Sequence, residues 1–99
     1  MKNTIIVNGK RKTCRIYDNG GKTVDRYTAC FRAERMKDGT RYYPFVGFST
    51  LPFSPLGFCQ HGDDELPIDR PSGKHLGKRI PFESLNEDCQ RLLIQELTN

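Results

Sequence analysis

The spacing of three turn signals in the first half of the chain constrains its fold more than any other sequence feature. Asn8-Gly9, Asp18-Asn19-Gly20-Gly21 and Asp38-Gly39 each supply residues that tolerate positive φ, which the tight turns of β-hairpins require. These turns separate four stretches with strand-like composition, at residues 4–7, 10–18, 23–35 and 41–50. Strands joined by such turns run antiparallel, so the sequence predicts a four-stranded meander.

Alternation of side chains indicates which faces of these strands are buried. It is clearest in the third strand, where Tyr27 and Ala29 alternate with Thr28 and Cys30. We expect the first pair to be buried and the second pair to lie on a wet face. In the fourth strand, Pro44 has no backbone N–H to donate. We therefore expect it at an edge, a bulge or the start of the strand.

The C-terminal residues have the apolar spacing of an amphipathic helix. The positions that form this stripe are Leu85, Cys89, Leu92, Leu93 and Leu97. A spacing of three and four residues places them on one side of a helix, which we expect to lie across one face of the sheet. Ser84 followed by Glu87 is typical of a capping box, and Asn86 is a competing cap.

Residues 42–64 hold six of the ten aromatic residues and three of the six prolines. The segment 51–77, which overlaps this stretch, has four prolines and no periodic pattern. We predict a long loop that Phe53, Leu56 and Phe58 pin against the core or a partner. A disordered lid is the alternative. The short apolar run that follows, at 78–82, is a further strand candidate.

Together these elements predict an α+β fold. We expect one domain over residues 1–99, with a mainly antiparallel sheet of four to five strands, a long aromatic and proline-rich loop, and one C-terminal helix packed on the sheet. The longest aliphatic run near the N-terminus, residues 5–7, is too short for a signal peptide or a membrane span. We therefore expect a cytoplasmic protein that does not engage a membrane.

Charge is distributed unevenly along the chain. Residues 1–50 carry 11 Lys/Arg and 4 Asp/Glu, whereas residues 51–99 carry 5 and 8. A basic half indicates an anionic partner such as nucleic acid, although such residues also occupy the solvated face of many sheets. The residues that could bind nucleic acid or another anion are Lys10, Arg11, Lys12, Arg15, Arg26, Arg32 and Arg41.

Cysteine and histidine residues could in principle support metal binding or catalysis. The four cysteines, Cys14, Cys30, Cys59 and Cys89, are widely spaced, and we expect free, partly buried thiols with no zinc site and no cofactor. Cys59 and His61 could form a thiol–imidazole pair, but no orienting residue can be named from the sequence. The acidic run nearby, Asp63, Asp64, Glu65 and Asp69, could bind a divalent cation or form a solvated loop.

Several stretches of the chain resemble small proteins of phages, plasmids and metagenomic contigs for which no activity is established. The similarity spans residues 14–93 and lies in the stretches 15–23, 25–28, 57–62, 67–71 and 75–80. It implies an accessory protein of a mobile element and assigns no catalytic residue.

From these observations we expect a small non-enzymatic protein that binds a host protein or ligand. The residues expected to form its binding surface are Phe53, Phe58, Gln60, His61 and His75. One alternative is a sequence-independent nucleic-acid-binding module that uses the basic sheet face. Another is a small enzyme built on Cys59, His61 and the nearby carboxylates. A homodimer is also compatible with the sequence.

Overall fold

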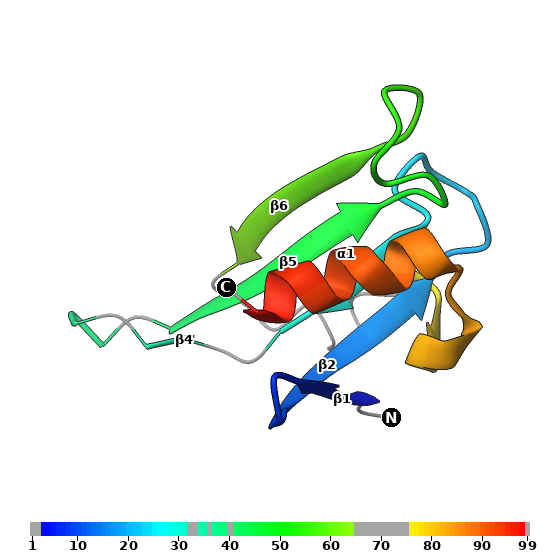
Figure 1. Ribbon diagram of the computed structural model, residues 1–99. Coiled ribbons are helices and arrows are strands. Elements are labelled where there is room, and N and C mark those ends of the chain that lie inside the picture. Colours follow the sequence, from blue (N-terminus) through cyan, green and yellow to red (C-terminus); the bar gives the residue numbers. More distant parts are fainter. Residues whose placement is uncertain (1–2, 32–33, 36, 40, 65–75, 99) are drawn as a thin grey trace.

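One antiparallel sheet and one helix make up the computed structural model, which describes residues 3–31, 34–35, 37–39, 41–64 and 76–98 (Figure 1). The strands are β1 (Asn3–Val7), β2 (Lys10–Asp18), β3 (Tyr27–Cys30), β4 (Glu34–Arg35), β5 (Arg41–Phe48), β6 (Cys59–Asp64) and β7 (Lys78–Ile80). A 3₁₀ turn, Phe82–Ser84, precedes helix α1 (Glu87–Thr98). The predicted α+β class, antiparallel sheet and C-terminal helix are confirmed.

Every strand pair that the described residues form is antiparallel. β1 pairs with the first half of β2, and β7 pairs with its second half. Asn3 joins these two short strands, because its amide donates to the Ile80 carbonyl (3.1 Å) and its side-chain oxygen accepts from the Phe82 N–H (2.9 Å). On the other side of β2, the order continues through β3 to β5, and β6 pairs with the far side of β5.

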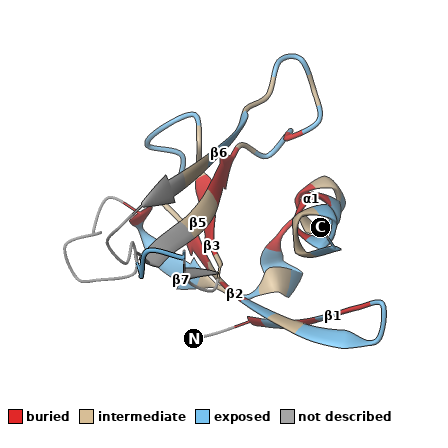
Figure 2. Cartoon of the chain, turned by 90° about the vertical axis from the view of Figure 1, so that its left-hand side faces the viewer, coloured by how far each residue is buried: buried red, intermediate tan, exposed pale blue. Residues whose placement is uncertain are grey.

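The main core lies between the sheet and α1, which crosses one face of the strands (Figures 1 and 2). The fully buried side chains of Ile16 in β2 and of Val46 and Phe48 in β5 face Cys89 and Leu93 of the helix. The aromatic rings of Tyr27 and Phe48 pack with their centroids 5.5 Å apart. The predicted apolar stripe of the helix is therefore the surface that completes this core.

A second, smaller cluster buries part of the opposite sheet face. It contains Tyr17, Cys30 and Leu76, with Phe45 packed against them. The expectation of a wet face on the third strand is therefore wrong at Cys30, and also at Thr28, which is only 7% exposed. The side chains alternate between the two faces as predicted, but apolar residues distant in sequence cover the second face as well.

Two predicted segments differ from the structure. The strand expected over residues 23–35 is reduced to β3 and β4, and residues 19–26 form a polar loop. The loop expected over residues 51–77 is wrong at residues 59–64, which form β6. This strand lacks apolar alternation because it contains Gln60, Gly62 and two aspartates, and its pairing with β5 is what makes it extended.

Pro44 lies within β5, at a change of register. β5 pairs Phe45 with Cys30 of β3 but pairs Tyr42 with Glu34 of β4, so the register shifts by one residue between the two. Such a shift is what a β-bulge produces. Pro44 therefore lies at a bulge, which is one of the three positions expected for it. The Pro44 carbonyl still accepts a hydrogen bond from the Phe31 N–H at 2.9 Å.

Helix α1 begins with the competing cap, Asn86. Its side-chain oxygen accepts a hydrogen bond from the Cys89 N–H at 2.9 Å, which satisfies one of the free donors in the first turn. Ser84 instead donates its hydroxyl to the Pro81 carbonyl within the preceding 3₁₀ turn. In the part of the chain described, no helix is long and apolar enough to cross a membrane.

Candidate functional site

The loop of residues 49–58, between β5 and β6, is a folded unit held by its serines. The Ser49 hydroxyl accepts the N–H groups of Leu51 (3.2 Å) and Phe58 (2.9 Å), so one side chain closes both ends of the loop. Ser54 similarly accepts the Leu56 N–H with its hydroxyl (3.1 Å). These contacts fix the backbone in two consecutive turns, as expected of short Ser-containing turns.

Glycine is required at one point of this loop. A Cβ atom on Gly57 would lie 1.6 Å from the carbonyl oxygen of Leu51. The backbone at these two points of the loop therefore approaches too closely for any residue other than glycine. The Gly57 N–H donates to the Ser54 carbonyl at 2.9 Å. The loop therefore has a specific, tightly packed path.

Although its backbone is fixed, the main part of this loop, residues 51–58 (the 51–58 loop), presents apolar side chains to solvent. Leu56 is 93% exposed, Leu51 51% and Phe53 43%. Pro52 is buried and Phe58 is half-buried, so these two residues anchor the loop while the other three point outward. Exposed large apolar side chains that cluster in one short segment are typical of a binding surface.

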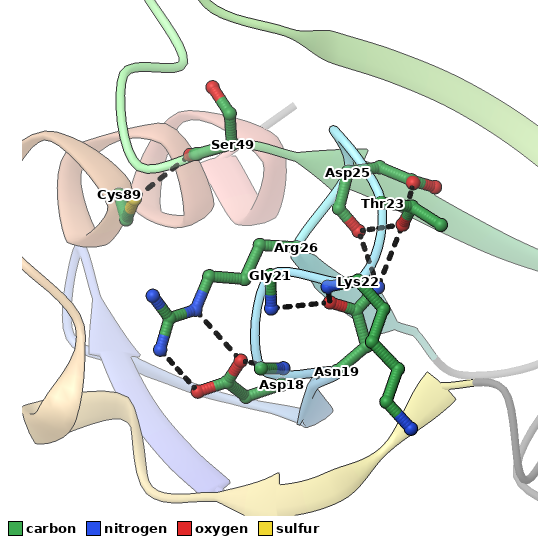
Figure 3. A network of polar contacts seen from close by, with 10 residues as sticks. Asp18, Asn19, Gly21, Lys22, Thr23, Asp25, Arg26, Ser49 and Cys89 are labelled. Carbon is green, nitrogen blue, oxygen red and sulfur yellow. Dashed lines mark hydrogen bonds and ion pairs between the residues drawn. The ribbon is translucent and has the colours of Figure 1, made fainter.

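Helix α1 supports the loop from one side. The Asn86 amide donates to the Thr50 carbonyl at 2.8 Å. The Cys89 thiol lies 3.4 Å from the Ser49 carbonyl oxygen, a contact drawn in Figure 3. The guanidinium of Arg91 lies 5.1 Å from the centre of the Phe53 ring, within the range of a cation–π contact. The helix thus holds the loop at three points along its length.

Next to the loop, β6 presents Cys59 and His61 to the helix. They lie opposite Phe48 and Val46 of the core, so both side chains are on the helix side of the sheet. The distance between His61 Nε2 and Glu96 Oε1 is 2.5 Å. The orienting residue that the sequence did not reveal is therefore Glu96, which comes from the last turns of α1.

The electrostatic environment of Cys59 disfavours the thiolate form that a nucleophilic cysteine needs. Loss of hydration raises the pKa of the Cys59 thiol, and the negative charge of Glu96 raises it further. A catalytic cysteine needs the opposite shift, because the thiolate is the nucleophile. Cys59, His61 and Glu96 are therefore close together but are not tuned for covalent catalysis.

Several other predicted site residues are separated or not described. Gln60 is exposed on β6, on the face opposite Cys59 and His61. Asp63 and Asp64 belong to the same strand, whereas Glu65, Asp69 and His75 lie outside the described residues. Within the ranges that are described, no group of three or more His, Cys, Asp or Glu side chains could hold a metal ion.

The structure divides the basic residues of the first strand pair between two faces. Lys10 and Lys12 lie opposite Val7 and Ile5, on the side that faces the helix. Arg11 is exposed on the other side. These three cations therefore cannot contact one flat anionic surface together.

The remaining basic candidates have different surroundings. Arg15 is half-buried in β2, and Arg26 binds Asp18 with Nε 2.9 Å from the carboxylate. Arg32 lies outside the described residues, and for Arg41 only its place in β5 is described. The described residues do not gather this set into one basic surface.

Arg26 instead closes the polar loop between β2 and β3, shown in Figure 3. Asp18 accepts both the Arg26 guanidinium and the Gly20 N–H (2.8 Å), and the Asn19 side chain accepts the N–H groups of Gly21 (2.9 Å) and Lys22 (3.1 Å). The bond to Arg26 is the main cause of a lowered pKa at Asp18. Arg26 therefore helps to hold this loop in place.

Sequence reasoning predicted a loop over residues 51–77 but missed three residues that support its 51–58 part. Ser49, Asn86 and Arg91 reach it from outside or from the helix, across up to 38 residues of sequence. The one available signal was Asn86, already recognised as a competing cap. Nothing in the sequence marked Glu96 as a partner of His61, because a glutamate beside the apolar stripe of a helix is usually solvated.

Comparisons with models of protein families, with curated proteins and with solved structures find no match to this chain. The properties of the site therefore rest on the contacts of its own residues.

Proposed function

We propose that this chain is a non-enzymatic binding protein that docks on a host protein through the 51–58 loop. The observation that carries the proposal is the combination of a fixed backbone with outward apolar side chains, above all Leu56 at 93% exposure. Full burial of a leucine side chain stabilises a complex by roughly 1.5–3 kcal/mol. A preformed loop also loses little conformational entropy when it binds.

The charges beside the loop favour a protein over an anionic surface. Asn86 places the start of α1 against the loop, and Glu87 and Asp88 follow it directly. Arg91, the cation that reaches the loop, is paired with Asp88 at 2.9 Å. An apolar cleft with a polar or basic rim complements this surface better than nucleic acid or anionic lipid does.

The resemblance to proteins of phages and mobile elements supports a bacterial host protein as the partner. A small accessory protein of such an element commonly acts by binding a component of its host. The raised pKa of Cys59 speaks against the alternative of a small cysteine enzyme at the neighbouring site.

A matched pair of exposed substitutions tests this proposal. Leu56→Asp places a charge at the tip of the loop, and Ile6→Asp places one on β1, where Ile6 is 68% exposed. Both proteins should melt close to the wild-type temperature. In affinity capture from host lysate, with mass spectrometry, a specific protein should be retained by wild type and Ile6→Asp and lost with Leu56→Asp.

A second capture experiment repeats the comparison in host lysate treated with nuclease. Capture that survives nuclease treatment and depends on Leu56 supports protein binding. Capture that disappears on nuclease treatment and is unchanged in Leu56→Asp would favour the nucleic-acid alternative, and the loop would then have to be given up as the binding site.

A further inference from the structure

The strand that follows the loop has one unpaired edge. Within the described part of the chain, β6 pairs only with β5, and it is the outermost strand of the sheet in Figure 1. The Ser49 N–H donates to the Phe58 carbonyl (2.9 Å), which fixes the alternation along the pair. Gln60 and Gly62 therefore direct their backbone groups toward β5, and Cys59 and His61 direct theirs away from the sheet.

The centre of this edge lacks the usual protection against pairing. Natural edge strands are commonly blocked by proline, lysine or a covering element. β6 contains neither proline nor lysine, and the backbone groups of Cys59 and His61 have no partner among the described residues. At the opposite edge of the sheet, by contrast, the Asn3 side chain bridges the ends of β1 and β7.

The sequence in and around β6 is acidic, although the whole chain carries a net charge of +4. No lysine or arginine occurs between Arg41 and Arg70, while β6 itself contains Asp63 and Asp64. Glu96 adds a further carboxylate beside His61. An incoming strand would therefore gain from carrying positive charge.

We propose that β6 accepts a basic, extended segment of a partner protein as an additional strand of the sheet. The segment would exchange backbone hydrogen bonds with Cys59 and His61, the recognition mode known as β-strand addition. β6 begins directly after Phe58, so one partner can contact this edge and the 51–58 loop together. The inference extends the proposed function, but it stands on the backbone edge and is tested separately from the loop.

Two substitutions at one position isolate the backbone donor. His61→Pro removes the outward N–H, which proline can do on an edge strand without breaking the ladder to β5. His61→Ala keeps that N–H and removes only the side chain and its contact with Glu96. Cys59→Pro and Cys59→Ala form a second pair with the same logic, should His61→Pro fail to fold.

The probes are two labelled eight-residue peptides, one alternating lysine with valine and the other alternating glutamate with valine. In fluorescence anisotropy, His61→Ala and wild type should bind the lysine peptide with similar affinity, and His61→Pro should bind it at least ten-fold more weakly. In amide hydrogen exchange by NMR, the lysine peptide should slow exchange at Cys59 and His61. Gln60 and Gly62 should already be protected without it.

Other results would overturn the inference. Equal binding of the lysine peptide by His61→Ala and His61→Pro would exclude the backbone edge, as would equal binding of the glutamate peptide. A wild-type dimer in sedimentation that His61→Pro dissociates would assign the edge to a second copy instead. Leu56→Asp should leave peptide binding within two-fold of wild type, so failure of the loop proposal and failure of this one remain distinguishable.

Discussion

His61 Nε2 lies 2.5 Å from Glu96 Oε1 and links the edge strand β6 to the C-terminal helix. The imidazole nitrogen donates this bond, since an ionised carboxylate can only accept. The contact joins residues 35 apart in sequence and ties β6, which pairing with β5 holds in the sheet, to the helix. Because Glu96 also helps to raise the pKa of Cys59, the same contact organises the site without activating its thiol.

The helix should be essential for folding. Leu92 is 4% exposed and belongs to the main core, so Leu92→Ala should lower the free energy of unfolding by roughly 2–5 kcal/mol. Ile94, on the same helix, is 40% exposed and serves as the control. Urea denaturation should show a much smaller loss for Ile94→Ala, and equal losses would contradict the packing described here.

The cap of α1 can be tested by substitution of the two candidate residues. Asn86→Ala should destabilise the protein by about 0.5–2 kcal/mol, because it removes the bond to the Cys89 N–H. The bond to Thr50 at the base of the loop is lost with it. Ser84→Ala loses only a local bond within the 3₁₀ turn and should cost less in the same denaturation experiment.

Gly62 should be sensitive to a single added methyl group. A Cβ atom there would lie 2.5 Å from Cζ of Phe45, so Gly62→Ala should destabilise the protein by roughly 1–3 kcal/mol through overpacking. Phe45→Leu shortens the opposing side chain. Thermal unfolding of the double variant should show a smaller loss than the sum of the two single variants, and strict additivity would argue against this contact.

The Asp18–Arg26 bond should make stability depend on pH in the acid range. Arg26 holds the pKa of Asp18 below its ordinary value of 3.8, so the unfolded chain binds this proton more tightly than the folded one. The stabilisation is therefore complete above about pH 4 and is lost as the pH falls through the lowered pKa. Asp18→Asn should match wild type most closely in strong acid and fall below it above about pH 4.

Urea unfolding of both proteins from about pH 2 to pH 6 checks this expectation. In a background that carries Arg26→Gln, the same substitution at Asp18 should alter the pH profile less, because the main cause of the shift is gone. An unchanged effect in that background would show that Arg26 is not the partner that matters.

Local sequence signals were sufficient for the elements whose residues interact with near neighbours. Asn8 and Gly9 adopt positive φ values of 51° and 77°, as the predicted two-residue turn requires. The apolar stripe of α1 packs on the sheet as its spacing predicts. In both cases the determining contacts repeat within a few residues, so periodicity and turn chemistry alone identify them.

The 51–58 loop could be predicted only in part from such local signals. Its composition predicted an ordered, apolar segment, but composition could not separate the residues that anchor it from those that it exposes. That distinction depends on Ser49, Asn86 and Arg91, which determine the path of the loop from outside. The outward position of Leu56 follows from that path and not from its own side chain.

The sequence by itself therefore determined the fold class, the first hairpin and the buried face of the helix, because each depends on local backbone preference and amphipathic spacing. Only the tertiary structure decided that residues 59–64 form a strand paired with β5, that Glu96 meets His61 and that Arg26 pairs with Asp18. The physical reason is that such pairings depend on surfaces brought together by folding, and no periodic pattern in either partner encodes them.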